Sequence, residues 1–141
     1  KEPSGLLRSD GKSPNGCTLI PLKNGNGKCL TWDVTVPDTL AASHLADTSH
    51  TAGAAAESAA RLKHLKYSEL SRTHDFVPIA VETLGPICKE GVDFISRVGS
   101  ELSNLSGDPR ETSFLFQRIS IIVQRCNYIS FRGSFMSPPV D

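Results

Sequence analysis

The sequence lacks a stretch that could cross a membrane and a signal that could direct secretion. Its longest apolar stretch, residues 119–123, is broken by Ser120 and falls far short of the roughly 18 residues that a membrane span needs. No secretory signal opens the chain. An initiator methionine is also missing, since the only methionine is Met136, and we therefore expect the chain to be part of a longer protein. We predict an intracellular chain that makes no membrane contact.

Closely spaced pairs of metal-binding residues are missing as well. The cysteines stand far apart in the chain: Cys17, Cys29, Cys88 and Cys126. The histidines show no ligand spacing with them: His44, His50, His64 and His74. A zinc site needs its ligands at short, regular intervals, and a chain of this size does not need a disulfide framework. Cys17 and Cys29 either face one another across a hairpin or act as small buried apolar residues.

Net charge is missing too, because 15 basic residues balance 15 acidic residues. This balance argues against strong, sequence-independent DNA binding, which depends on lysine and arginine displacing counterions. Residues 61–72 are locally basic, with four basic side chains against Glu69. This cluster is either a surface for an anionic partner or an ordinary solvated helix face. With 38% hydrophobic and 21% charged residues, the chain has the composition of one folded globular domain.

The chain is organised around a hairpin in residues 13–36. We expect strands over residues 18–22 and 29–36, joined by a turn that contains two Asn-Gly pairs. Asp33 stands inside the second strand, between Trp32 and Val34. An acid is disfavoured in a strand because it does not pack on the pleated face and cannot be buried without a partner. Two explanations are open, an edge position or a bound metal.

A helix and a further strand follow the hairpin. Residues 51–70 predict a helix that Thr51 caps, and the alanines of this helix permit a close approach to a sheet. Residues 76–83 predict a buried strand, although Pro78 argues against a central position in the sheet. A hairpin followed by a helix and a strand predicts an α/β fold. We expect a small mixed sheet of at least three strands, with flanking helices and a helical C-terminal tail.

Two further helices complete the chain. Apolar residues recur at helical spacing over residues 87–105, and Gly107 ends that helix. Asp108 and Glu111 predict a capping box at the start of the last helix. In a capping box the Asp108 side chain accepts the Glu111 backbone N–H, and the Glu111 side chain accepts the Asp108 backbone N–H.

The last helix carries more apolar surface than one neighbour can cover. It is expected to pack either against both earlier helices or against a partner, self-association included. We find no internal repeat. The predicted divisions of the chain are an irregular segment, an α/β domain, a C-terminal helix and a frayed tail: residues 1–12, 13–106, 107–133 and 134–141.

Four segments resemble one known domain when they are taken in order. They are Ser-Pro-Asn-Gly at residues 13–16, Trp-Asp-Val-Thr-Val at 32–36, Lys-His-Leu-Lys-Tyr at 63–67, and the apolar strand with its following turn at 76–85. This series resembles the restriction-like endonuclease domain of non-LTR retrotransposon polyproteins, a variant of the PD-(D/E)XK nuclease fold. The resemblance spans roughly residues 11–85. It departs from the motif at one position, where Asn15 stands in place of the first acid.

The resemblance implies metal-dependent nicking of DNA. Asp33 would be the principal ligand of Mg²⁺ or Mn²⁺, with Asn15 beside it and Glu82 as a lesser ligand. Lys63 or Lys66 would be the catalytic lysine, and Tyr67 would help to hold that end of the helix. The partners implied are DNA and an upstream reverse transcriptase region of the same polyprotein. The implied compartment is the nucleus.

Each candidate residue also has an ordinary structural explanation. Asp33 would be a surface acid on an edge strand, Lys63 and Lys66 solvated helix residues, and Glu82 a cap of the turn before the next helix. Because Asn15 carries no charge, metal affinity should fall steeply, and we expect weak or absent cleavage. Two alternatives follow: a catalytically inactive domain of the same fold that binds nucleic acid or protein, and an unrelated α/β interaction protein whose last helix docks on a partner.

Overall fold

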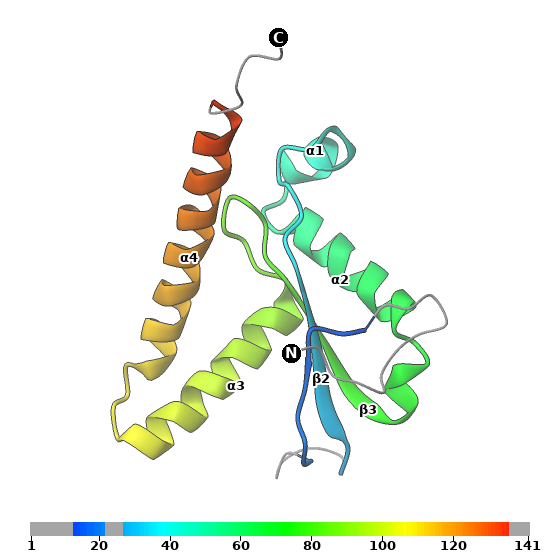
Figure 1. The fold of residues 1–141 in the computed structure, drawn as a ribbon, viewed down its shortest axis with the longest axis vertical. Coiled ribbons are helices and arrows are strands. Elements are labelled where there is room, and N and C mark those ends of the chain that lie inside the picture. Colours follow the sequence, from blue (N-terminus) through cyan, green and yellow to red (C-terminus); the bar gives the residue numbers. More distant parts are fainter. Residues whose placement is uncertain (1–12, 22–26, 136–141) are drawn as a thin grey trace.

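A mixed three-stranded sheet lies at the centre of the molecule. The computed structural model describes residues 13–21 and 27–135. The strands β1 (Gly16–Cys17), β2 (Cys29–Thr35) and β3 (His74–Ala80) lie in the order β1-β2-β3 (Figure 1). β1 runs antiparallel and β3 parallel to β2. This arrangement confirms the predicted mixed α/β fold and makes β2 the central strand.

The first strand, β1, lies earlier in the chain than the strand predicted over residues 18–22. The prediction is therefore wrong for residues 18–21, and Leu22 lies outside the described residues. Thr18 makes the last contacts with β2: its N–H donates to the Leu30 carbonyl at 2.8 Å, and its hydroxyl accepts from the Leu30 N–H at 2.9 Å. The threonine side chain thus replaces the next backbone acceptor of the ladder. Leu19 and Ile20 then turn into solvent, 97% and 73% exposed, and Pro21 has no N–H to donate.

The helix α2 (Ala54–Lys66) carries the chain from β2 across to β3, between parallel strands. Three of its alanines are buried, Ala55, Ala56 and Ala60, and their small side chains let the helix lie close to the sheet. The prediction of a helix here is confirmed, but it begins after residue 51 and ends before residue 70. A short 3₁₀ turn, η1 (Leu70–Arg72), leads into β3.

Within the described residues, β3 lies at an edge of the sheet, as Pro78 predicts. Proline offers no backbone donor, and the Pro78 carbonyl accepts a weak contact from the buried Cys88 thiol at 3.6 Å. The strand occupies His74–Ala80, two residues earlier than expected at its start and three at its end. Val81 continues it only as an isolated bridge to Ile87, because the chain reverses through Gly85, whose φ is 111°.

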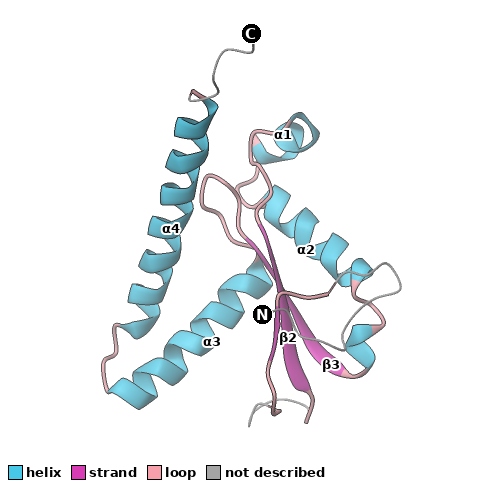
Figure 2. Cartoon of the chain, in the orientation of Figure 1, coloured by secondary structure: helices cyan, strands magenta, loops and turns pink. Residues whose placement is uncertain are grey.

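Three further helices surround this core (Figure 2). The helix α1 (Ala42–Thr48) precedes α2, α3 (Lys89–Ser106) begins beside β3, and α4 (Glu111–Ser134) follows α3 and contacts it. Glu57 of α2 accepts the Lys89 N–H at 2.6 Å and thereby fixes the start of α3. Gly107 ends α3 with a φ of 77°, as predicted.

The helix α4 makes a limited contact with the rest of the fold. Its first turn packs against α3, where a Cβ added to Gly99 would lie 2.6 Å from the Thr112 Cα. Further along, the Asn127 side chain donates to the Thr83 carbonyl at 2.5 Å. No residue of α4 is fully buried. Figure 1 accordingly shows α4 rising away from α3 toward the loop that follows β3.

The predicted capping box at the start of α4 is wrong in its detail. The Asp108 carboxylate accepts the Arg110 N–H at 2.9 Å, one residue earlier than a capping box requires. The Asp108 N–H donates to the Ser106 hydroxyl at 3.2 Å rather than to Glu111. Arg110 adds two side-chain bonds to the same carboxylate, at 3.0 and 2.9 Å. An Asp–Arg pair therefore takes the place of the expected Asp–Glu box.

Candidate functional site

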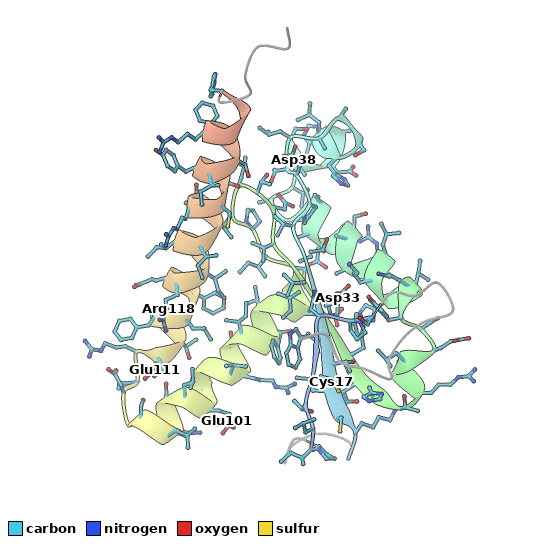
Figure 3. The ribbon with its side chains drawn as sticks, in the orientation of Figure 1. Cys17, Asp33, Asp38, Glu101, Glu111 and Arg118 are labelled. Carbon is cyan, nitrogen blue, oxygen red and sulfur yellow. The ribbon has the colours of Figure 1, made fainter. Side chains whose placement is uncertain are left out.

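Asp33 lies in the middle of the central strand and is only 4% exposed. The ammonium of Lys63 on α2 lies 2.6 Å from its Oδ2. The side chain of Asp33 is 6% exposed and that of Lys63 is 21% exposed. The explanation of Asp33 as a surface acid on an edge strand is therefore wrong. Figure 3 labels Asp33 near the centre of the sheet, on the side of α2.

The crossover brings these two residues together. The side chain of Asp33 points to the same face of β2 as Thr31 and Thr35, because side chains alternate along a strand. That face is the one that α2 covers. Lys63 follows the buried Ala60 by three residues, so it lies on the sheet-facing side of the helix. From this side of the helix its ammonium reaches the Asp33 carboxylate.

Asn15 joins the same part of the strand from the other side. Its Oδ1 accepts the Val34 N–H at 2.5 Å, so the side chain extends the pairing of β1 with β2 by one bond. Since Val34 follows Asp33 directly, the Asn15 side chain lies beside the acid's own strand position. Three of the predicted residues, Asn15, Asp33 and Lys63, therefore meet around one stretch of β2. The Asn15 oxygen is already engaged by the backbone.

Tyr67 holds the C-terminal end of α2 against the sheet. It is 2% exposed, its hydroxyl donates to the Ser13 carbonyl at 3.1 Å, and its ring lies 4.9 Å from that of Phe76. The Lys66 ammonium lies 4.7 Å from the centre of the Tyr67 ring, which is a cation–π distance. The predicted role of Tyr67 in holding the helix end agrees with these contacts.

Glu82 lies elsewhere and has a different task. It is fully buried, and its Oε1 accepts the N–H groups of Ala55 and Ala56 at 2.9 and 3.1 Å. The carboxylate thus caps the start of α2 in place of Thr51, and it caps the preceding helix rather than the turn before the next one. Asp33 pairs in register with Pro78; Glu82 follows four residues later, roughly 13 Å at about 3.3 Å per residue. The structure does not bring Glu82 to Asp33.

The residues around Asp33 do not suit a magnesium or manganese ion as they stand. Both ions prefer several oxygen ligands, with carboxylates among them. Asp33 supplies one carboxylate, and Lys63 occupies one of its oxygens. Asn15 supplies an uncharged oxygen that the Val34 N–H already fills. In the part of the chain that the structure describes, no three or more His, Cys, Asp or Glu side chains gather where they could hold a metal.

Basic side chains surround the same end of α2. Lys28, just before β2, donates to the Ser71 carbonyl of η1 at 2.9 Å. Arg61 and Arg72 are exposed, and Lys66 is partly exposed. These residues come from the start of β2, from α2 and from η1, and together they make the local charge positive.

Two cysteines lie on the hairpin strands near this region. Cys17 and Cys29 are free thiols and are each partly buried, so the expectation of small buried residues is met only in part. Burial raises the pKa of the Cys17 thiol, and the neighbouring Cys29 raises it further. Both effects favour the neutral thiol over the thiolate that reacts with oxidants or metals.

One feature that the sequence analysis missed lies on α4. Its exposed side carries arginines at seven-residue intervals: Arg118, Arg125 and Arg132. The signal was present in the sequence as three similar units, at residues 114–120, 121–127 and 128–134. The expectation that the chain contains no internal repeat does not hold for this helix.

Within the described residues, no helix combines the length and the apolar character that a membrane crossing requires. Comparison of the chain with family models, with curated proteins and with solved structures gives no match to any of them.

Proposed function

We propose that the chain is a restriction-endonuclease-like domain that binds DNA and nicks it weakly, because Asn15 stands where the first metal-binding acid would be. The observation that carries the proposal is the ion pair between Asp33 on the central strand and Lys63 on the crossover helix, with Asn15 beside it. Nothing in the comparisons supports or opposes this assignment.

The burial of the ion pair supports a functional origin. Removing two charges from water is costly, and an apolar pair of similar volume is often at least as stable. A sheet that required only packing at this point would be served by apolar side chains. A buried acid with a lysine partner is a frequent feature of catalytic sites, and phosphodiester cleavage needs both an anionic ligand and a cation.

The surrounding charge supports DNA as the partner. Lys28, Arg61, Lys66 and Arg72 offer cations to phosphates, which position a duplex without selecting its sequence. The whole chain has no net charge, so binding should be weak and should decrease steeply as salt is added.

The Asn15→Asp variant tests the cleavage half of the proposal. One carboxylate oxygen can keep the bond to the Val34 N–H, while the other adds negative charge at an exposed position beside the buried Asp33, where two carboxylates can share a divalent cation. We expect the unmodified chain to relax supercoiled plasmid barely above background with Mn²⁺, and Asn15→Asp to raise the rate at least tenfold. Mn²⁺ is used first because it tolerates less regular ligand geometry than Mg²⁺.

Two further variants serve as controls. Asn104→Asp adds the same charge on the exposed surface of α3 and should leave nicking at background. Adding Asp33→Ala to Asn15→Asp should abolish the gain. Strong nicking by the unmodified chain would show that Asn15 is tolerated. No gain in Asn15→Asp, or a gain that survives the loss of Asp33, would remove this site.

The alternative is a domain of the same fold that binds DNA but does not cleave it. A binding measurement distinguishes this alternative from the nuclease proposal. Fluorescence anisotropy of a labelled 20-base-pair duplex at low salt should show binding that Arg61→Glu and Arg72→Glu each weaken. Binding without a gain of nicking in Asn15→Asp would favour the inactive domain. The absence of binding at low salt would contradict both forms of the proposal.

A further inference from the structure

The outward side of α4 has a regular construction that the Asp33 site does not explain. Residues 114–134 form three successive units of seven: Phe-Leu-Phe-Gln-Arg-Ile-Ser, Ile-Ile-Val-Gln-Arg-Cys-Asn and Tyr-Ile-Ser-Phe-Arg-Gly-Ser. Each unit begins with two large apolar residues, has arginine at its fifth position and ends in a small or amide side chain. All three units lie within one continuous helix.

A seven-residue interval in a helix returns to nearly the same side, because two turns take 7.2 residues. The repeat therefore forms rows along α4. The arginine row comprises Arg118, Arg125 and Arg132. One apolar row comprises Phe114, Ile121, Tyr128 and Phe135. The other comprises Leu115, Ile122 and Ile129. The arginines follow the first apolar row by four residues and the second by three, so they run between the two.

The apolar residues of these rows are exposed, except for Leu115, which is partly buried. Ile121 is 66% exposed, Phe135 is 72% exposed, and Ile122, Tyr128 and Ile129 are each 59% exposed. Ile119 and Val123 are partly buried; Ile119 borders the second apolar row, four residues after Leu115 and three before Ile122. Figure 3 shows the side chains of α4, with Arg118 among those labelled, projecting from a helix that has a neighbour only along part of its length.

We propose that this outward face docks a helix of a partner protein, one in which acidic side chains recur every seven residues between two apolar rows. A sustained seven-residue apolar repeat is the pattern by which helices pack along one another. The two apolar rows would bury their side chains against the partner's apolar rows. The arginines between them would pair with the partner's carboxylates.

The charge of α4 selects an acidic partner. Between Thr112 and Phe135 the helix contains three arginines and no acidic residue, so nothing within this stretch neutralises the row. Arginine pairs well with carboxylates because its planar group can donate two parallel hydrogen bonds. Successive arginines lie about 10.5 Å apart along the helix, at 1.5 Å per residue. Carboxylates at the same interval on a parallel or antiparallel helix would meet all three.

A second copy of the chain does not fit this face. In a parallel pair each arginine would meet its own counterpart, and in an antiparallel pair Arg118 would meet Arg132 while Arg125 met itself. Like charges that face one another oppose association. Duplex DNA would satisfy the arginines but would leave the two apolar rows in water, and a bilayer that took up both apolar rows would also enclose the arginine row between them.

A pair of synthetic peptides tests the proposal with the whole chain. Both are fluorescein-labelled 28-residue helical peptides with leucine in two rows; one carries glutamate and the other lysine at every seventh position between them. We expect the unmodified chain to bind the glutamate peptide at least tenfold more tightly than the lysine peptide, by fluorescence anisotropy. In the triple variant Arg118→Glu/Arg125→Glu/Arg132→Glu this preference should reverse.

A matched pair of single variants gives the finer measurement. Arg125→Glu should weaken binding of the glutamate peptide about tenfold, whereas Arg97→Glu, an exposed charge on α3, should leave it unchanged. Far-ultraviolet circular dichroism checks that each variant keeps its helices, and the comparison of peptides on the unmodified chain does not depend on any variant. Equal affinity for the two peptides, or no binding of either, would overturn the proposal. So would a dimer in sedimentation that the triple variant dissociates, or binding of duplex DNA through the arginine row without binding of the peptide.

Discussion

The Asp33 region and α4 both contain charged side chains among apolar ones. The two regions differ in whether the charged side chain has a partner of opposite charge within the fold. At the sheet, the carboxylate of Asp33 is enclosed and has its cation, Lys63, at 2.6 Å. On α4, the arginine row and its apolar neighbours are exposed to solvent. A charge paired inside the fold destabilises the chain when its partner alone is removed, whereas a charge at the surface is available to a binding partner. Changes in the two regions should therefore be detected by different measurements.

Breaking the enclosed pair should have the largest effect on stability. Lys63→Met keeps the length of the stem and leaves Asp33 buried without a cation, which should cost about 3 kcal/mol, the lower end of the range for a broken buried pair because Lys63 is partly exposed. In a domain of this size that corresponds to a fall in Tm of roughly 6–12 °C. Urea and thermal unfolding followed by circular dichroism provide the measurement.

Two controls make the result specific. Arg61→Met, on the same helix, removes an exposed cation and should leave the free energy of unfolding nearly unchanged. The double variant Asp33→Leu/Lys63→Met removes both charges and should recover much of the lost stability. If Lys63→Met unfolds at the same urea concentration as the unmodified chain, the ion pair does not hold the sheet and α2 together.

The sequence predicts the enclosed region well where its signals are local. Asp33 attracts attention because an acid between Trp32 and Val34 contradicts strand propensity, whereas Lys63 is indicated only by the resemblance of the segment Lys-His-Leu-Lys-Tyr to a nuclease motif. The central position of β2 and the crossover of α2 follow from the order of the elements. The 2.6 Å contact lies within what those expectations allow, although neither propensity nor spacing could select Lys63 over Lys66.

Two of the failures have a common physical cause, which is a partner that lies 12 or more residues away in the sequence. Thr51 is a reasonable helix cap by residue type, but the buried carboxylate of Glu82 bonds the first amides of α2 from 27 residues away. The Thr18 hydroxyl replaces a backbone acceptor for Leu30, 12 residues away. The third failure is local, because the Asp108 carboxylate bonds Arg110, two residues away, and not the Glu111 amide. Side chains that replace backbone partners depend on tertiary contacts, and local patterns do not contain them.

The attachment of α4 to the core can be broken separately, with a smaller effect. A Cβ at position 99 would lie 2.5 Å from the Thr112 Oγ1 and 2.6 Å from the Thr112 Cα, so Gly99→Ala must push α3 and α4 apart. Overpacking of this kind costs about 1–3 kcal/mol, offset by about 1 kcal/mol from the better helix propensity of alanine. We expect the free energy of unfolding to fall by roughly 1 kcal/mol. Relative to the unmodified chain, hydrogen exchange should become faster in α4, and it should change less in the sheet.

Gly133→Ala is the matched control for this variant. A Cβ at that position would meet no atom within 4 Å, so only helix propensity should act, and exchange near the end of α4 should become slower. Equal exchange rates of α4 in the Gly99→Ala variant and the unmodified chain would show that the contact with Thr112 does not hold the helix.

The smallest effect should come from the start of α4 and should depend on pH. Hydrogen bonds from the Arg110 side chain and then from its backbone lower the pKa of Asp108 below its ordinary value of 3.8. The charged carboxylate therefore stabilises the folded chain above about pH 4, and this contribution disappears as the pH falls through the lowered folded pKa. Asp108→Asn should thus unfold at slightly lower urea than the unmodified chain at pH 7, and the difference should vanish toward pH 2. A difference that stays constant or grows on acidification would mean that the Asp108–Arg110 pair does not stabilise this end of α4.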